Sequence, residues 1–368
     1  MYCADCEKLE NYFFDNTTFW LFLPTLDSVG KALTYCQSSN YPVTKQSSHC
    51  LSVEVSRAQI QHFLLGIYGE FEPPEVANTK VTTTAGAAPN LEDMGRMVSA
   101  EVLVNRFNSA WMIDSITEHR YETHFQPIFT LDDQGQHHAY GQEGLFRIRD
   151  NNNVIVPPGL AFQLAEHSDL LFSLDLAARR SAVSHYAMAK LNGKLFINFN
   201  PSSIYDPSYC LRATASAISA LGIPPSNVVF EITETHNVTN ESVMKGILNF
   251  YRNAGFGVAL DDIGSGWSGL NMLHKLRPDY VKIDMELVRN IHIDSYKQAI
   301  VKHLVQIAHA NGAKVVAEGI ETEDELAVLK QYKPDYYQGY YFAKPSFFEA
   351  QCTVQEQQRI KAILTGVQ

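Results

Sequence analysis

The chain has 368 residues, of which 45% are apolar and 19% are charged, a composition typical of a folded globular protein. Its 29 basic and 40 acidic residues give a formal net charge of −11, which argues against a protein that wraps long nucleic acid, because that function needs a basic footprint. We expect no membrane span and a cytoplasmic protein with reduced thiols, since no apolar run approaches roughly 20 residues and the chain starts without a signal-peptide pattern.

The first 75 residues are predicted to form a small α/β module. The runs 18–24 and 49–56 have the composition of strands, and the segments 26–40 and 57–71 carry apolar residues at helical spacing. This strand-helix-strand-helix order suggests a compact unit that is too small for a second catalytic domain. We therefore expect a sensor or regulatory module.

Residues 76–114 are predicted to be a linker followed by a connecting helix. The stretch 72–90 is rich in Pro, Thr and Ala and nearly free of large apolar residues, which is typical of a linker. From Leu91 to Arg120, apolar residues recur on one helical face. Such a helix is suited to carrying a signal or pairing with a second copy, and equally to packing on the following domain.

Residues 115–368 alternate strand-like and helix-like segments and are predicted to form a (β/α)8 TIM-type barrel. Eight short apolar runs follow one another from about Glu122 to Phe342, and several of the intervening helical segments end in glycine, as helix stops do. Repeated units of this spacing favour a closed parallel barrel over an open sheet, although periodicity alone permits both. The chain lacks the Gly-rich phosphate loop of a dinucleotide-binding fold.

Charged or amide side chains stand at the ends of most of these runs. In a parallel barrel such residues converge on one rim, where barrel enzymes keep their active sites. Oxygen donors without a His or Cys cluster favour Mg²⁺ or Mn²⁺ over Zn²⁺, and adjacent acids can hold a pair of ions of the kind that supports phosphodiester hydrolysis. The strand-end residues are Glu143, Asn198, Glu231, Glu234, Asp261, Asp262, Lys282, Glu318 and Gln338.

A series of short motifs runs through the same region: FQPI, EGLFR, INFN, EITET, LDDIGSGWSGL, LRPDYVKID, VVAEGIET and DYYQGYYFAKP. In order and spacing, from about Ser115 to Phe348, they resemble the motifs of the EAL phosphodiesterases, which hydrolyse the bacterial second messenger cyclic di-GMP to linear pGpG. The resemblance implies a barrel enzyme that needs two divalent cations, Mg²⁺ or Mn²⁺, and forms a homodimer.

The resemblance also implies a role for individual residues. One metal ion would be held by Glu143, Asn198, Glu231 and Asp261. The second would lie between Asp261, Asp262 and Glu318, with Asp261 bridging. Catalytic roles would fall to Lys282, Gln338, Glu318 and Glu234; the first two would position or polarise the attacking water, and Glu234 would brace the loop after Asp262. Contacts to the dinucleotide are implied for Gln126, Leu145 and Arg147.

Four positions depart from the family pattern. Gly144 replaces the Ala of the signature, Asn200 replaces a Ser, and Ile263 and Trp267 replace a Phe and a Tyr in the loop after the Asp pair. None removes a predicted metal ligand, so we expect an active enzyme whose rate or regulation differs at that loop.

Two other functions fit part of this pattern. A non-catalytic receptor would bind cyclic di-GMP and pass the signal to a partner protein, but the intact ligand set argues against it. An enolase-like barrel also holds Mg²⁺ on strand-end carboxylates beside a Lys base. The adjacent Asp pair and the match of whole motifs favour the EAL family over this reading.

Cysteines in the predicted module suggest a further metal site. Cys3 and Cys6, together with Cys36, His49 and Cys50, offer enough ligands for a structural or sensing Zn²⁺. Cys36 also fits the apolar face of its helix, so the same residues are compatible with ordinary reduced thiols. The spacing leaves both interpretations open.

Overall fold

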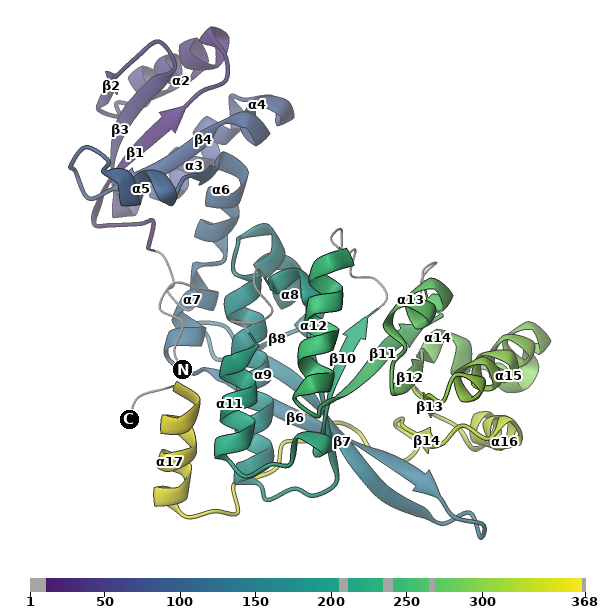
Figure 1. The fold of residues 1–368 in the computed structure, drawn as a ribbon. Helices are drawn as coiled ribbons and strands as arrows, with labels where there is room; N and C mark the ends of the chain where they lie inside the picture. The colour runs from purple at the N-terminus through teal and green to yellow at the C-terminus, as the bar shows by residue number, and fades with distance from the viewer. Residues whose placement is uncertain (1–10, 205–210, 234–240, 265–268, 366–368) are drawn as a thin grey trace. The chain divides into compact units, whose positions relative to one another are not determined.

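The computed structural model describes residues 11–204, 211–233, 241–264 and 269–365 (Figure 1). These residues form two compact units. The barrel unit contains residues 121–148 and 175–365, and the N-terminal unit contains residues 11–120 and 149–174.

The barrel unit is built on a closed sheet of eight strands. They are β6 (Tyr121–Leu131), β7 (His137–Arg149), β9 (Lys194–Asn198), β10 (Val228–Thr233), β11 (Gly257–Ile263), β12 (Tyr280–Ile283), β13 (Lys314–Ala317) and β14 (Tyr336–Tyr337). The order of neighbours is β6-β14-β13-β12-β11-β10-β9-β7, and β6 also pairs with β7, which closes the sheet. The pairings from β7 round to β14 are all parallel. The closed barrel confirms the TIM-type architecture.

One strand corrects the expectation of an all-parallel barrel. β6 runs antiparallel to both of its neighbours, β7 and β14. The physical reason is the tight turn that follows it, in which the Asp132 side chain accepts hydrogen bonds from the backbone N–H groups of Gln134 and Gln136. A turn this short makes a hairpin, because parallel neighbours need a crossover of a dozen or more residues.

Helices connect the parallel strands and flank the sheet (Figure 1). They are α9 (Leu171–Met188), α11 (Arg212–Ala220), α12 (Glu241–Asn253), α13 (Gly269–Leu276), α14 (Met285–Val288), α15 (Ser295–Ala310), α16 (Glu323–Tyr332) and α17 (Val354–Thr365), with 3₁₀ turns η2 (Pro201–Ser203), η3 (Pro225–Asn227) and η4 (Ile291–Ile293). Of the glycines expected to stop helices, Gly255 and Gly312 lie just after α12 and α15 with φ of 84° and 79°. Gly193 lies beyond the end of α9, where Lys190 takes the left-handed conformation with a φ of 51°. Among the described helices, none is long and apolar enough to span a bilayer.

The N-terminal unit contains a five-stranded antiparallel sheet in the order β2-β3-β1-β4-β5. The strands are β1 (Asn16–Phe22), β2 (Val43–Lys45), β3 (Cys50–Ser56), β4 (Lys80–Thr84) and β5 (Val98–Ser99). The helical segments are η1 (Arg57–Gln59), α2 (Leu26–Ser38), α3 (Ile60–Gly69), α4 (Pro73–Asn78), α5 (Leu91–Gly95), α6 (Ala100–Asn108), α7 (Ala110–Thr117) and α8 (Pro158–His167), and the short strand β8 (Ile155–Val156) precedes α8. Apolar side chains of β1, β3, α2, α3 and α6 make one core.

The segment 76–114 differs from the linker and single helix expected for it. β4 pairs with β1 along its length, and Val81 is buried in the core of this unit. The run of β-branched residues in KVTTT favours a strand, a signal that the flanking Pro and Ala residues obscured. Beyond it, the expected helix is divided into α5, β5, α6 and α7, and Ser99 caps α6 by accepting a hydrogen bond from the Val102 N–H.

Candidate active site

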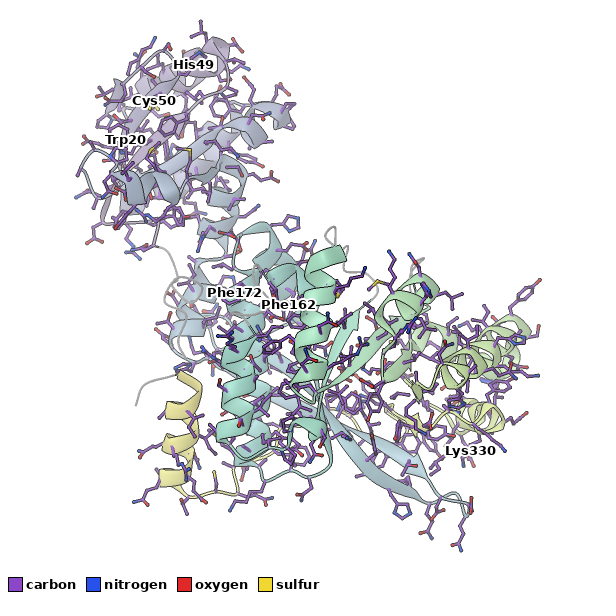
Figure 2. All side chains as sticks on the ribbon, viewed as in Figure 1. Trp20, His49, Cys50, Phe162, Phe172 and Lys330 are labelled. Atoms are coloured by element: carbon purple, nitrogen blue, oxygen red, sulfur yellow. The ribbon has the colours of Figure 1, made fainter. Side chains whose placement is uncertain are left out.

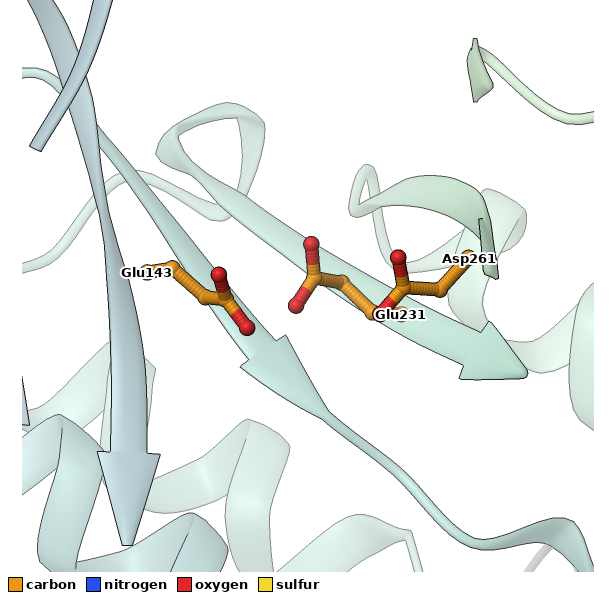
Figure 3. Close-up of side chains that lie close together, drawn as sticks. All are labelled: Glu143, Glu231 and Asp261. Atoms are coloured by element: carbon orange, nitrogen blue, oxygen red, sulfur yellow. The ribbon is translucent and has the colours of Figure 1, made fainter. Parts of the chain in front are cut away.

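Three carboxylates from different strands meet inside the barrel. β7, β10 and β11 present Glu143, Glu231 and Asp261, whose side chains point toward one another (Figure 3). One oxygen from each carboxylate lies within 4.8 Å of the others. All three residues are buried, and Glu231 is fully so. Parallel pairing places these strands side by side: Glu143 lies opposite Phe196 of β9, Glu231 lies opposite Asn198 of β9, and Asp261 lies opposite Thr233 of β10.

A second group of carboxylates shares Asp261 with the first. Oxygens of Asp261, Asp262 and Glu318 also lie within 4.8 Å of one another. Asp262 has a φ of 56°, and the β11–β12 register shifts between Leu260 and Ile263. A left-handed backbone at a residue other than Gly is uncommon and clusters at functional sites. This local strain lets two adjacent acids serve one cavity rather than opposite faces of the strand.

Lys282 lies at the centre of both groups. Its Nζ is 2.7 Å from Glu231 Oε1 and 2.7 Å from Glu318 Oε1, 3.1 Å from Asp261 Oδ1 and 3.6 Å from Glu143 Oε2. Burial alone would lower the pKa of Lys282, but the surrounding carboxylates raise it well above its usual value. Lys282 is therefore a cation in the interior of the barrel.

The acids outnumber this one cation. Burial raises the pKa of Glu231, Asp261 and Glu318, and burial together with the Asp261 charge raises the pKa of Asp262 to about 7. Glu231 Oε2 is buried and has no hydrogen-bond partner among the described residues. Buried oxygens without partners and an excess of carboxylates fit the binding of divalent cations, which prefer such ligands.

Amide side chains complete the site. The Asn198 Nδ2 donates to Glu143 Oε1 at 3.1 Å, and the Gln338 Nε2 donates to Glu143 Oε2 at 2.7 Å and to Gln126 Oε1 at 3.3 Å. A half-turn of the Asn198 amide would present its oxygen in place of its nitrogen, as a metal ligand requires. These contacts gather residues of β6, β7, β9 and the segment after β14.

The cluster opens into a cavity of about 360 Å³. Its lining includes Gln126 and Gln338, but the implied substrate contacts Leu145 and Arg147 do not belong to it. They follow Glu143 on the same face of β7, where residues alternate. Glu234 and Trp267 lie outside the described residues.

Sequence reasoning missed part of the cavity wall. The additional lining residues lie in the segments that follow β12, β13 and β14, and they are Asp284, Met285, Arg289, Gly319, Glu321, Gly339 and Tyr340. All seven follow a predicted strand-end residue by one to seven positions. That position on the active rim is the signal that could have identified them.

The candidate zinc ligands are not gathered in the described structure. Cys3 and Cys6 lie outside the described residues. Cys36 is fully buried in the apolar core, and burial raises the pKa of its thiol to about 12. His49 hydrogen-bonds to the Leu23 carbonyl oxygen through Nδ1, and it lies beside Cys50 at the start of β3 (Figure 2).

Known proteins resemble this chain over the barrel. The probable cyclic di-GMP phosphodiesterase PdeG of Escherichia coli is 32% identical to this chain. The match covers 56% of this chain and 41% of the length of PdeG. The cyclic di-GMP phosphodiesterase RocR of Pseudomonas aeruginosa is 29% identical over 69% of this chain and 70% of its own length. A standalone EAL protein from Vibrio cholerae, solved bound to c-di-GMP, is 35% identical with a TM-score of 0.55 and covers 65% of this chain and 97% of its own.

One structural likeness extends beyond the barrel. Klebsiella pneumoniae BlrP1, solved as a manganese and cyclic di-GMP complex, covers 90% of this chain and 96% of its own with a TM-score of 0.53. At 22% identity this likeness concerns the fold alone. The sequence model of the EAL domain matches residues 110–345, which is more than half of the chain. The resemblance expected from the motifs is thus confirmed, and the chain belongs to the EAL domain family.

Proposed function

We propose that this protein is a metal-dependent phosphodiesterase that hydrolyses cyclic di-GMP to linear pGpG. The observation that carries the proposal is the pair of carboxylate groups that share Asp261 and surround Lys282. A binding protein has no need for such an excess of buried charge, which is costly unless it is paired. We infer the substrate from the names of the relatives and from the c-di-GMP bound to the Vibrio cholerae protein.

Two divalent cations, Mg²⁺ or Mn²⁺, are part of the proposal. One would be held by Glu143, Asn198, Glu231 and Asp261, and the other by Asp261, Asp262 and Glu318. In sites of this kind, the chemistry that two bound ions supply is activation of a water and stabilisation of the leaving oxygen. The unpartnered Glu231 Oε2 and the shared Asp261 support this division.

The chain's own residues have separate tasks in this reaction. Lys282, which is surrounded by carboxylates, donates hydrogen bonds to the attacking water or to a phosphate oxygen. Gln338 orients the water with its amide, and Glu318 holds Lys282 in place through the 2.7 Å contact. Contacts of Gln126, Leu145 and Arg147 with the dinucleotide, and the bracing role of Glu234, remain predictions.

Regulation by the N-terminal unit is also proposed. This unit includes residues 149–174, so it contains the α8 segment that connects β7, which carries Glu143, to α9. Within the unit, the Asn105 Nδ2 donates to the His167 carbonyl oxygen at 3.3 Å, and Arg106 Nη1 lies 3.4 Å from Asp169 Oδ2. The fully buried Phe63 offers a test. We expect Phe63→Ala to loosen this unit and change cyclic di-GMP turnover; unchanged turnover would contradict regulation.

A homodimer completes the proposal. Exposed apolar side chains recur along η4 and α15 at Ile293, Tyr296, Ile300 and Ile307. Steps of three, four and seven residues are the spacing of a helix-pairing seam. We expect sedimentation velocity to give a dimer that Ile300→Asp converts to a monomer. A wild-type monomer at micromolar concentration would contradict this.

The experiment that tests the function compares turnover with binding. Purified full chain is incubated with cyclic di-GMP and Mn²⁺, and the product is identified by chromatography, while equilibrium dialysis in Ca²⁺ measures binding. We expect pGpG to form. Tight binding without product would favour the receptor, and neither binding nor product would contradict both functions.

A further inference from the structure

Glu325 lies in the first turn of α16 and does not line the cavity, yet its carboxylate is buried, with the residue 2% exposed. Its Oε1 accepts a hydrogen bond from the Asn290 N–H at 2.9 Å. Its Oε2 accepts from the Glu321 N–H at 2.9 Å and from the Thr322 N–H at 3.0 Å. One carboxylate therefore joins the backbones of two segments that are separated by some thirty residues.

These two segments form adjacent walls of the cavity. Residues 284–290 follow β12, the strand of Lys282, and residues 318–322 follow β13 and begin with Glu318. On the exposed rim the two segments are linked by Arg289 Nη2 and Glu321 Oε1, which lie 2.8 Å apart. Exposed ion pairs of this kind contribute little. The buried carboxylate beneath is the stronger link, because charged acceptors make the stronger hydrogen bonds.

The segments also approach each other closely at one glycine. Gly319 has a φ of 65°, and a methyl group there would collide with the side chain of Met285. The two segments are therefore closely packed at this point. The relative placement of Lys282 and Glu318, which are 2.7 Å apart at Nζ and Oε1, thus depends on how the two segments are held together.

We propose that Glu325 is a positioning residue that fixes these two segments against each other and so sets the geometry of the metal and Lys282 site. The proposal rests on the proposed phosphodiesterase function. Burial alone would raise the pKa of Glu325, but the backbone N–H groups of Asn290, Glu321 and Thr322 lower it. Both oxygens therefore act as acceptors at neutral pH, as the bridge requires.

The competing explanation is that Glu325 only caps α16. Thr322 and Glu325 form a capping box, in which the Thr322 Oγ1 accepts from the Glu325 N–H and the Glu325 side chain accepts from the Thr322 N–H. Glutamine serves this box as well as glutamate does. The hydrogen bond from the Asn290 N–H is not part of the capping box. If glutamine replaces Glu325, its amide oxygen can still accept from the Glu321 and Thr322 N–H groups, but its NH₂ group then faces the Asn290 N–H, and two donors cannot form a hydrogen bond. Glu325→Gln therefore breaks the bridge and keeps the cap.

The test uses the full chain and three proteins: wild type, Glu325→Gln and Thr322→Val. The valine variant removes the capping hydroxyl and keeps the backbone N–H that Glu325 uses, so it is the matched control. Two readouts are needed: the Mn²⁺ concentration that gives half of the maximal rise in melting temperature, and kcat and KM for cyclic di-GMP. Replacing a residue that hydrogen-bonds a metal ligand typically changes metal affinity or activity by about 10–100-fold. Glu325 acts through the backbone of the neighbouring segments, so we take the lower end of that range.

We expect Glu325→Gln to raise the half-saturating Mn²⁺ concentration and to lower kcat, each by about tenfold, at a melting temperature close to that of wild type. Thr322→Val should lower the melting temperature and leave both Mn²⁺ affinity and kcat within about twofold. Wild-type values for Glu325→Gln, or equal effects of the two variants, would overturn the proposal. Mn²⁺ binding is measured without substrate, so it can be tested even if the protein is not a phosphodiesterase. A wild type that binds Mn²⁺ but makes no pGpG would contradict the proposed function. The effect of Glu325→Gln on Mn²⁺ affinity would then decide this inference.

Discussion

Val229 and Glu231 lie two residues apart on β10, and both point into the barrel, but they belong to different layers. The apolar layer, toward the start of the parallel strands, is made of Ile128, Phe196, Val229, Ala259, Tyr280, Val316, Tyr140 and Tyr336. The polar layer follows on the same strands or just after them, and its residues are Asn198, Glu231, Asp261, Lys282, Glu318 and Gln338. In the apolar layer, the Tyr140 and Tyr280 hydroxyls are 2.6 Å apart, and the Tyr140 ring stacks on Tyr336.

The difference between the layers shows how one strand serves both stability and function. Residues alternate along a strand, so a step of two keeps the side chain in the barrel and moves it up one layer. The apolar layer closes the barrel from below, and the buried charges above it interact more strongly than they would in bulk water. On β6 the order is reversed: Gln126 of the cavity precedes Ile128 of the apolar layer, because this strand runs antiparallel.

The largest effect is expected when the shared ligand of the polar layer is removed. Asp261→Asn should lower cyclic di-GMP turnover about a thousandfold or more, which corresponds to about 4 kcal/mol, because both carboxylate groups lose a member. The exposed Asp324 provides a control with the same chemical change. Steady-state kinetics of Asp261→Asn and Asp324→Asn measure this; near-normal turnover in the first would show that Asp261 is no ligand.

Lys282→Ala should affect both chemistry and stability. We expect kcat to fall about a hundredfold with little change in KM, since Lys282 acts in the transition state. Without metal, the variant should lose about 3–5 kcal/mol of unfolding free energy, because the buried carboxylates lose their cation. Added Mn²⁺ should raise its melting temperature more than that of wild type. Equal losses of kcat and substrate affinity would make Lys282 a substrate anchor instead.

A change in the apolar layer should lower stability and leave turnover almost unchanged. Tyr280→Phe removes the hydroxyl that pairs with Tyr140, and we expect it to cost about 1 kcal/mol of stability with turnover within about twofold of wild type. Urea unfolding and steady-state kinetics on the same preparation measure the two quantities. A large loss of kcat with stability unchanged would mean that the layers are not separate in function.

The smallest effect concerns the N-terminal unit, where the described core is apolar. Burial raises the pKa of Cys36 to about 12, so at pH 8 only about one thiol in ten thousand is ionised, and the thiolate is the reactive form. We expect Cys36 of the native protein to resist alkylation at pH 8, as followed by mass spectrometry of digested protein. Rapid alkylation of Cys36 would contradict its burial in the core, and zinc bound at one ion per chain and lost in Cys36→Ser would support the zinc site.

The sequence predicted the barrel and the residues that the structure gathers in it, because most of the candidate acids stand at the end of an apolar run and the motifs around them keep a recognisable order. Glu143, Glu231, Asp261 and Glu318 meet around Lys282, and Asp262 lies close to Asp261 and Glu318, while their roles remain predictions. Other features depend on interactions that periodicity does not contain. The antiparallel direction of β6 depends on the turn at Asp132. The link that Glu325 makes between two segments of the cavity wall depends on a long-range hydrogen bond from the Asn290 N–H.

The account's central claim is that the polar layer of the barrel is a hydrolytic metal site. The most direct measurement is the initial rate of pGpG formation by the full chain after chelation with EDTA and then after titration with Mn²⁺. We predict no measurable rate with chelator, a rate that returns and saturates as Mn²⁺ is added, and no return in Asp261→Asn. A rate that is unaffected by EDTA, or restored by Mn²⁺ in Asp261→Asn, would contradict the claim.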